Sequence, residues 1–183
     1  MTSPADHIEG AGDIVEALTA LGFDPVLVGG MALVTLGSRR VTQDFDFVVA
    51  APGQRLNDLV ALFYDRGLEL VARFGRAGEV LATIDNPAVA AIRLRLDAPS
   101  SAHFYHPTSE LRIDLLFDFP LKAADLAHRA KRVRVRERRF TVAAIEDLLR
   151  LKQVARASRT SPGDLEDIEF LRTLRRRRSR YDR

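Results

Sequence analysis

The stretch Val26-Leu27-Val28-Gly29-Gly30, followed after thirteen residues by Asp44-Phe45-Asp46-Phe47-Val48-Val49, decides the fold predicted for this chain. The run Val26 to Val28 is too short for a helix and lies between Pro25 and two glycines, so it predicts a buried strand. Met31 to Leu36 supplies good helix formers, so a helix begins where the strand ends. The free backbone N–H groups at such a helix start favour phosphate binding.

A second strand is predicted from Asp44 to Val49, because aromatic and β-branched residues dominate it. Residues two apart in a strand point to the same side, so Asp44 and Asp46 share one face. Neighbouring carboxylates repel each other unless one is protonated or a divalent cation lies between them. Mg²⁺ prefers one or two carboxylates plus the oxygens of a substrate phosphate. The acid pair beside a glycine turn therefore indicates a nucleoside triphosphate and phosphoryl chemistry.

The glycines and the paired acids resemble the signature of the nucleotidyltransferase superfamily, whose fold is that of DNA polymerase beta. The string Arg40 to Asp46 is similar to the Arg-x-Thr-x-Asp-x-Asp of small bacterial nucleotidyltransferases, including the AbiEii-type toxins. The resemblance implies an α/β (α+β) fold with a mixed, mostly antiparallel sheet, flanking helices and a helical C-terminal part. It also implies that the nucleotide is bound by Gly29, Gly30, Arg40 and Thr42. Taken alone, an Asp-x-Asp pair is more often a solvated strand face.

A third acid is expected from the strand predicted over Leu111 to Asp118. Asp114 lies inside an apolar run, where an acid is seldom without a partner. If this strand is next to the Asp44 strand, Asp114 completes a three-acid cluster, and it resembles the third acidic position of the superfamily. The alternative pairs Asp114 with Arg112 on the same strand face. Asp118 is predicted to be a strand-end or turn residue.

The C-terminal part supplies the remaining candidate residues. Ala143 to Ser158 predicts an amphipathic helix, and the resemblance implies that its Lys152 holds the triphosphate; the alternative is a surface lysine. The chain from Arg159 resembles the Arg-x-Lys-Asp-x-x-Asp ending of these families, with Asp164 and Asp167 as its acids. It departs from that pattern in a longer loop and in Gly163, which replaces the usual Lys. Asp164 could equally cap the last helix.

Length and composition set the expected organisation. We expect a single structural unit of 183 residues, with a nucleotidyltransferase core over residues 1–142 and a C-terminal helical part with a basic tail over residues 143–183. The chain has no window of eighteen apolar residues and no basic start of a signal peptide, so the expected location is cytoplasmic, with no membrane partner. Cysteine is absent, which excludes disulfides and thiolate metal sites.

The net charge of +3 is unevenly distributed. Residues 1–36 contain acids but no Lys or Arg, whereas basic residues gather over Lys131 to Arg139 and Arg175 to Arg180. A basic surface suits a polyanion such as RNA. The alternative is a solvated strand face and a soluble tail.

Two other segments receive predictions without a role in the site. Val89 to Leu96 alternates apolar residues with Arg93 and Arg95, which predicts a half-buried strand. The segment around His103 and His106 is expected to be irregular with at most a short strand, and its histidines are expected to be surface or wall residues without a catalytic role.

The predicted function is therefore an Mg²⁺-dependent nucleotidyltransferase that moves a nucleoside monophosphate from an NTP to a hydroxyl. Two Mg²⁺ ions would be held by Asp44 and Asp46, with support from Asp114. Lys152 and Asp164 complete the predicted catalytic residues. The basic segments favour RNA or a tRNA 3′ end as acceptor, and the resemblance adds a cognate antitoxin protein as a possible partner. An antibiotic-type small-molecule acceptor and a non-catalytic nucleotide-binding or partner-binding protein remain alternatives.

Overall fold

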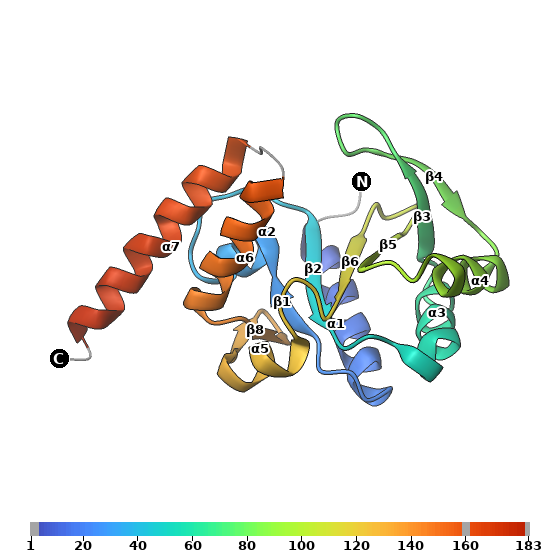
Figure 1. Cartoon of the computed structure of the whole chain (residues 1–183), viewed down its shortest axis with the longest axis horizontal. Helices are drawn as coiled ribbons and strands as arrows, with labels where there is room; N and C mark the ends of the chain where they lie inside the picture. Colours follow the sequence, from blue (N-terminus) through green and yellow to red (C-terminus); the bar gives the residue numbers. More distant parts are fainter. Residues whose placement is uncertain (1–3, 159–161, 182–183) are drawn as a thin grey trace.

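The computed structural model describes residues 4–158 and 162–181, and an eight-stranded sheet runs through them (Figure 1). The strands are β1 (Val26–Val28), β2 (Asp44–Val49), β3 (Glu69–Phe74), β4 (Val80–Ile84), β5 (Ser101–Tyr105), β6 (Arg112–Phe117), β7 (Lys131–Val135) and β8 (Arg138–Val142). Their order in the sheet is β4-β3-β5-β6-β2-β1-β8-β7. Of the described strand pairs, β1/β8 and β2/β6 are parallel and the others antiparallel. The predicted mixed, mostly antiparallel sheet is confirmed.

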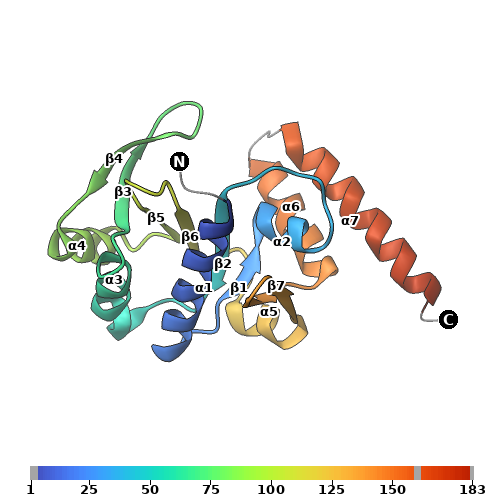
Figure 2. The same ribbon diagram turned by 180° about the vertical axis from the view of Figure 1, so that it is seen from behind.

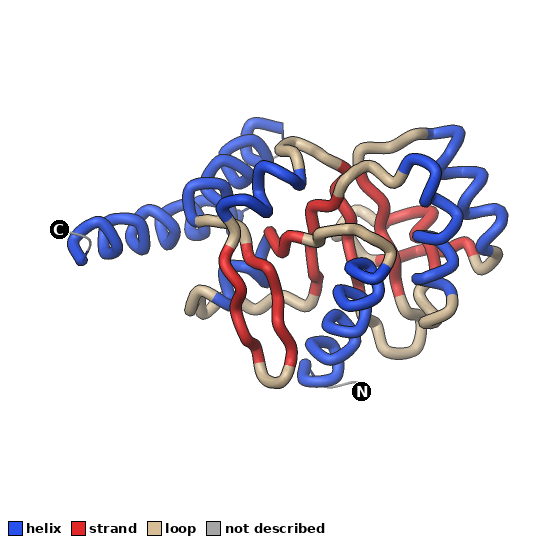
Figure 3. Tube along the Cα trace, turned by 90° about the horizontal axis from the view of Figure 1, so that it is seen from below, coloured by secondary structure: helices blue, strands red, loops and turns tan. Residues whose placement is uncertain are grey.

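Helices lie on both faces of this sheet, as the views from behind and from below show (Figures 2 and 3). They are α1 (Pro4–Ala20), α2 (Gly29–Thr35), α3 (Leu56–Tyr64), which follows a 3₁₀ turn at Gly53–Arg55, α4 (Pro87–Asp97), α5 (Ala123–Arg129), α6 (Ile145–Ser158) and α7 (Pro162–Tyr181). None of these described helices is both long and apolar enough to cross a membrane.

One part of the hydrophobic core lies between a face of the sheet and the helices α1 and α3, and a second part contains buried residues of α2, α5, α6 and α7. Phe45 and Phe47 of β2 both stack on Phe140 of β8, and Phe63 of α3 stacks on Phe104 of β5 with ring centroids 3.9 Å apart. Helix α1 packs against β8 and α3 and crosses in front of the sheet in Figure 2. Because strand residues alternate in direction, the apolar residues of β2 fill this core while its two acids face the other side.

The opposite face meets the C-terminal helices. Helix α5 contacts β1, and α6 packs against α7, which projects from the body of the molecule (Figure 1). Figures 1 and 3 place the pair α6 and α7 across the sheet from α1. The polar edge of the central strands is therefore next to the C-terminal helical part.

Helix α4 corrects one prediction, because Val89 to Leu96 is helical and not a strand. Asn86 accepts hydrogen bonds from the backbone N–H groups of Ala88 and Val89, and Pro87 occupies the first turn, where its missing N–H costs nothing. The alternation of apolar and basic residues was misleading, because Ile92 and Leu96 are exposed.

Strand β5 corrects a second prediction. The region around His103, expected to be mostly irregular, forms a full strand between β3 and β6. Its burial alternates, with Ala102 and Phe104 buried between partly exposed neighbours. The position of β5 places His103 directly opposite Asp114 of β6.

Candidate active site

Three acids lie on one face of the sheet, where β2 and β6 run in parallel. The register pairs Asp46 with Asp114 and Asp44 with Arg112. Directly paired strand residues point to the same side, so the three carboxylates and the Arg112 guanidinium share one face. Asp114 is buried, and Asp44 and Asp46 are partly buried. The structure thus brings together the three acids that the sequence singled out.

Of these three acids, Asp46 has the negative charge that neighbouring positive groups compensate least. Burial and the neighbouring carboxylates of Asp114 and Asp44 raise its pKa to about 7, while Arg112 and Lys152 only partly oppose the increase. The pKa of Asp44 is also raised, mainly by burial, although Arg112 pulls it down. A carboxylate that is deprived of water and surrounded by like charges binds either a proton or a metal ion.

Asp114 has partners on both of its oxygens. Arg112 donates from Nε to Oδ1 at 3.0 Å and from Nη2 to Oδ2 at 2.8 Å, which is a two-pronged pair. His103 Nδ1 lies 2.9 Å from Oδ1. Burial alone would raise the pKa of Asp114, but His103 and Arg112 outweigh it and hold that pKa below its usual value. The predicted alternative, a pair between Asp114 and Arg112, is therefore present together with the three-acid arrangement.

The glycine turn lies directly behind Asp46. Gly29 has a φ of +65°, and a Cβ at this position would overlap the Asp46 carboxylate. A Cβ on Gly30 would lie 3.0 Å from Arg40 Nε and 3.1 Å from Thr42 Oγ1. The turn is therefore next to Arg40, Thr42 and Asp46, three of the candidate residues of the Arg40 to Asp46 string, and only glycine fits at its first position.

A second charged cluster joins α6, α7 and the loop before β2. Lys152 Nζ lies 3.1 Å from Asp164 Oδ1 and 2.6 Å from Asp167 Oδ2, and Arg40 pairs with the same Asp167 oxygen. Both acids are buried. We refer to Arg40, Lys152, Asp164 and Asp167 as the helical cluster. It contains three of the predicted site residues, Arg40, Lys152 and Asp164, whose roles in the reaction stay predictions; Arg159 lies outside the described residues.

Asp164 keeps one oxygen without a partner. Its Oδ2 is buried and accepts no hydrogen bond from any described residue, so the alternative role as a helix cap has no support from these contacts. A buried acceptor without a partner is unusual in a folded protein.

The donor set fits a divalent cation that also binds a substrate. Within residues 4–158 and 162–181, no three Asp, Glu, His or Cys side chains are grouped to hold a metal ion by themselves. Mg²⁺ needs only one or two carboxylates when phosphate oxygens and water complete its shell, and Asp44 and Asp46 supply that number. A site with Asp114 as a third metal ligand stays a prediction.

Two residues of importance were missed by the sequence reasoning. Arg112 was considered only as an alternative partner, and His103 was given no role. The alternating apolar residues around His103 were the available signal for a strand, and a strand beside β6 brings His103 to Asp114.

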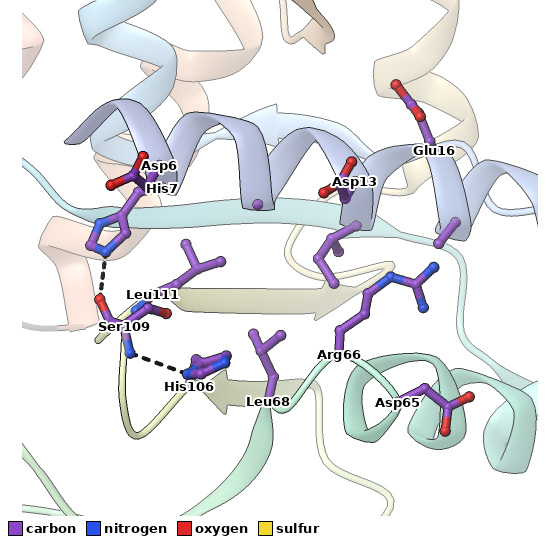
Figure 4. A pocket seen from close by; sticks show the side chains of 13 residues that line it. Asp6, His7, Asp13, Glu16, Asp65, Arg66, Leu68, His106, Ser109 and Leu111 are labelled. Carbon is purple, nitrogen blue, oxygen red and sulfur yellow. Dashed lines mark hydrogen bonds between the residues drawn. The ribbon is translucent and has the colours of Figure 1, made fainter. Parts of the chain in front are cut away.

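A separate cavity of about 830 Å³ lies under α1, close to the β5–β6 turn (Figure 4). None of the predicted site residues lines it. His7 Nε2 donates to the Ser109 carbonyl at 2.7 Å, and His106 Nδ1 accepts from the N–H groups of Thr108 and Ser109. These two histidines hold the turn in place.

Comparison with known proteins identifies the architecture. A scan of protein-family models and a search of curated proteins found no match. Among solved structures, the chain is similar to an antigenic nucleotidyltransferase-like protein from Paracoccidioides brasiliensis (TM-score 0.59, 17% identity, 95% of this chain and 78% of that one). It is also similar to the lincosamide antibiotic adenylyltransferase LnuA (0.56, 13%, 90% and 95%) and to a putative nucleotidyltransferase from Thermotoga maritima (0.54, 12%, 97% and 96%). The chain therefore has the nucleotidyltransferase fold.

Proposed function

We propose that the protein is an Mg²⁺-dependent nucleotidyltransferase that moves a nucleoside monophosphate from an NTP to a hydroxyl group and releases pyrophosphate. The observation that carries this proposal is the position of Asp46, which lies between two other carboxylates and against the Gly29 turn. Burial and the neighbouring carboxylates raise its pKa, and a divalent cation bound there would supply the opposing positive charge. The shared fold supports the same conclusion.

Each part of the site has a distinct role in this reaction. Asp44 and Asp46 would hold the two ions, which when bound neutralise the triphosphate and make the acceptor hydroxyl more acidic. Gly29 and Gly30 allow the backbone to approach the phosphates, and Thr42 lies at the edge of that turn. Lys152 and Arg40 offset phosphate charge, after releasing part of their contact with Asp167. Asp164 holds Lys152 on the nucleotide side of the site.

We propose RNA, such as a tRNA 3′ end, as the acceptor. Three basic residues of the Lys131 to Arg139 segment are exposed on the edge strand β7, whereas Arg138 on β8 pairs with acids of α1. Further arginines line a cavity of about 500 Å³ near α5, α6 and α7. The exposed basic residues of β7 are Lys131, Arg132 and Arg134. The cavity is lined by Arg129, Arg150, Arg172 and Arg175 together with Glu146 and Asp147, and Asp147 pairs with Arg129. A surface of this kind suits phosphodiesters. In the cell, such a reaction on RNA would make the protein a toxin whose partner is a cognate antitoxin.

A small-molecule acceptor is the second candidate, because LnuA, an antibiotic adenylyltransferase with lincomycin bound in its structure, resembles this chain over most of its length. The two acceptors differ in their dependence on salt. RNA binding through several phosphates weakens steeply and log-linearly with ionic strength, whereas a small acceptor depends on salt weakly. Transfer rates measured with tRNA and with lincosamide or aminoglycoside panels between about 50 and 200 mM salt distinguish them.

The test of the proposed reaction is substitution of the paired acids. Asp44→Asn and Asp46→Asn should each reduce transfer of label from an α-³²P NTP by at least about 100-fold, because each removes a ligand of the reacting phosphate's metal ions. Asp58→Asn, an exposed acid on α3, is the matched control. Unchanged transfer in both active-site variants refutes the proposal. Calorimetry with Mg²⁺ and each NTP identifies the non-catalytic alternative, which binds without turnover.

A further inference from the structure

We propose that Arg112 is an internal counter-ion of the acid site, which consists of Asp44, Asp46 and Asp114. The Arg112 guanidinium holds Asp114 in position and competes with the divalent cation for the same negative charge. The inference rests on the proposed function, since it concerns the same carboxylates. Its consequence is that the metal-free protein is held in a self-paired state, and that metal binds against the positive charge of Arg112.

The first support is the position of the guanidinium. Arg112 forms two hydrogen bonds with Asp114, at 3.0 and 2.8 Å, and its third nitrogen, Nη1, lies 3.7 Å from Asp44 Oδ2. One monovalent cation thus bridges two of the three acids. Asp46 lies directly opposite Asp114 in the register and two residues after Asp44 on the same strand. A divalent ion at Asp44 and Asp46 would therefore lie next to an existing positive charge.

The second support is that the β3–β4 hairpin holds Arg112 in this position. The guanidinium carbon lies 4.7 Å from the centre of the Phe74 ring, which is a cation–π distance. Arg112 Nη1 also donates to the Gly78 carbonyl at 3.5 Å. Phe74 in turn meets His103 edge-on at 5.2 Å, and His103 contacts Asp114. The hairpin and β5 thus enclose the Arg112–Asp114 pair from outside the site.

The third support is electrostatic. The Arg112 side chain is 20% exposed, so water screens its charge only in part. Repulsion between a guanidinium and a divalent ion a few ångströms away costs several times more than one between monovalent ions in bulk water. Removal of the Arg112 charge should therefore tighten metal binding, whereas a residue that only stabilised the fold would leave metal affinity unchanged.

The test is Mn²⁺ titration of the metal-free 183-residue chain without nucleotide, followed by the EPR signal of free Mn²⁺. Arg112→Gln, which keeps a hydrogen-bond donor but loses the charge, should bind Mn²⁺ at least about tenfold more tightly than the wild-type chain. Arg112→Lys should stay within about threefold of it, because the charge is preserved. Arg93→Gln on α4, where the arginine pairs with Asp97, is the matched control and should change nothing.

Equal or weaker Mn²⁺ binding by Arg112→Gln overturns the inference. Circular dichroism of the same samples verifies folding, and Arg112→Leu, which keeps apolar contact with Phe74, replaces the glutamine variant if that one does not fold. Asp46→Asn separates the two proposals: wild-type Mn²⁺ affinity that does not depend on Asp46 contradicts the proposed site itself. Affinity that depends on Asp46 but not on Arg112 contradicts only the inference.

A kinetic measurement provides a second readout. In the presence of NTP and acceptor, Arg112→Gln should reach half-maximal rate at an Mg²⁺ concentration at least about tenfold lower than the wild-type enzyme. Its kcat should fall, because Asp114 loses its two-pronged orientation. A lower kcat with an unchanged Mg²⁺ requirement would mean that Arg112 orients Asp114 without competing with the metal.

Discussion

The acid site and the helical cluster both contain several charged side chains, but they differ in the balance of positive and negative charge. The acid site places three carboxylates beside Arg112 and His103, and its central acid, Asp46, has a raised pKa of about 7. In the helical cluster two basic residues face two acids at ion-pair distance. One cluster is short of positive charge, and the other is neutral within itself.

This difference in charge balance distinguishes the acid site, which we expect to bind a ligand, from the helical cluster, which we expect to stabilise the structure around it. A buried cluster with excess charge pays a cost in the free protein that a ligand of opposite charge removes. A neutral buried cluster loses stability when either partner is removed. We therefore expect substitutions in the acid site to affect function more than stability and substitutions in the helical cluster to affect both.

The largest effect is expected from Gly29→Ala. The φ of +65° disfavours any side chain, and the new Cβ would overlap the Asp46 carboxylate. We expect a loss of about 4 kcal/mol in the free energy of unfolding, measured with urea, together with loss of transfer activity. Gly37→Ala is the matched control: its φ is +95°, but a Cβ there meets nothing within 4 Å. Equal costs for both variants would show that contact with Asp46 contributes nothing.

Lys152→Met tests the helical cluster. It leaves Asp164 and Asp167 buried with Arg40 as the remaining basic partner of the cluster. We expect destabilisation of about 3 kcal/mol in urea unfolding and a higher KM for the NTP. Gln153→Met, an exposed neighbour on the same helix, is the control. A variant as stable as the wild-type protein would contradict the balanced-cluster description.

The pH dependence of stability tests the acid site. The pKa of Asp46 is about 7 in the folded protein and near its ordinary value of 3.8 when unfolded, so the folded state binds the proton more tightly. The resulting stability is complete below about pH 4 and is lost as pH rises through 7. Asp46→Asn should therefore become more stable than the metal-free wild type by on the order of 2 kcal/mol at pH 8, allowing for solvent screening.

The same comparison at about pH 4 should show little difference, because Asp46 is protonated in the folded state and already partly protonated in the unfolded state. Saturating Mg²⁺ at pH 8 should stabilise the wild-type protein and not Asp46→Asn. Urea unfolding at both pH values measures these differences. An Asp46→Asn variant that is less stable than the metal-free wild type at pH 8 would be incompatible with an uncompensated charge.

The smallest effect is expected from Arg40→Gln. Its side chain is 34% exposed, so water can replace much of its contact with Asp167, and Lys152 still pairs with that acid. We expect a stability loss of about 1 kcal/mol, clearly less than for Lys152→Met, and weaker NTP binding. Arg39→Gln, at an exposed neighbouring position, is the control. A loss of stability equal to that of Lys152→Met would contradict this expectation, because both cations would then contribute equally to the helical cluster.

Much of the fold could be predicted from local patterns. The strands at Val26 and Asp44 follow from β-branched and aromatic residues between turn signals, and their pairing puts Val28 opposite Asp46. Helix α4 was missed because alternation over a few residues is compatible with both periods, and the stronger signal was Asn86 followed by Pro87. Local sequence cannot reveal that Ile92 and Leu96 face solvent.

The composition of the site was predictable, but its internal pairing was not. The acids and Lys152 stand out by residue type and resemblance. The contact between His103 and Asp114 depends on β5 lying beside β6, and the contact between Arg40 and Asp167 joins residues 127 positions apart. Such contacts are set by strand order and helix packing, which no local pattern encodes.

The parallel pairing of β2 with β6 also has a kinetic consequence. Neighbouring hairpins such as β7–β8 can form from local chain alone, whereas Asp46 meets Asp114 only after a long loop has closed. The mutual repulsion of the acids is therefore encountered late in folding, when the surrounding sheet is already in place. Divalent cations should consequently slow unfolding of the native chain more than they accelerate its refolding.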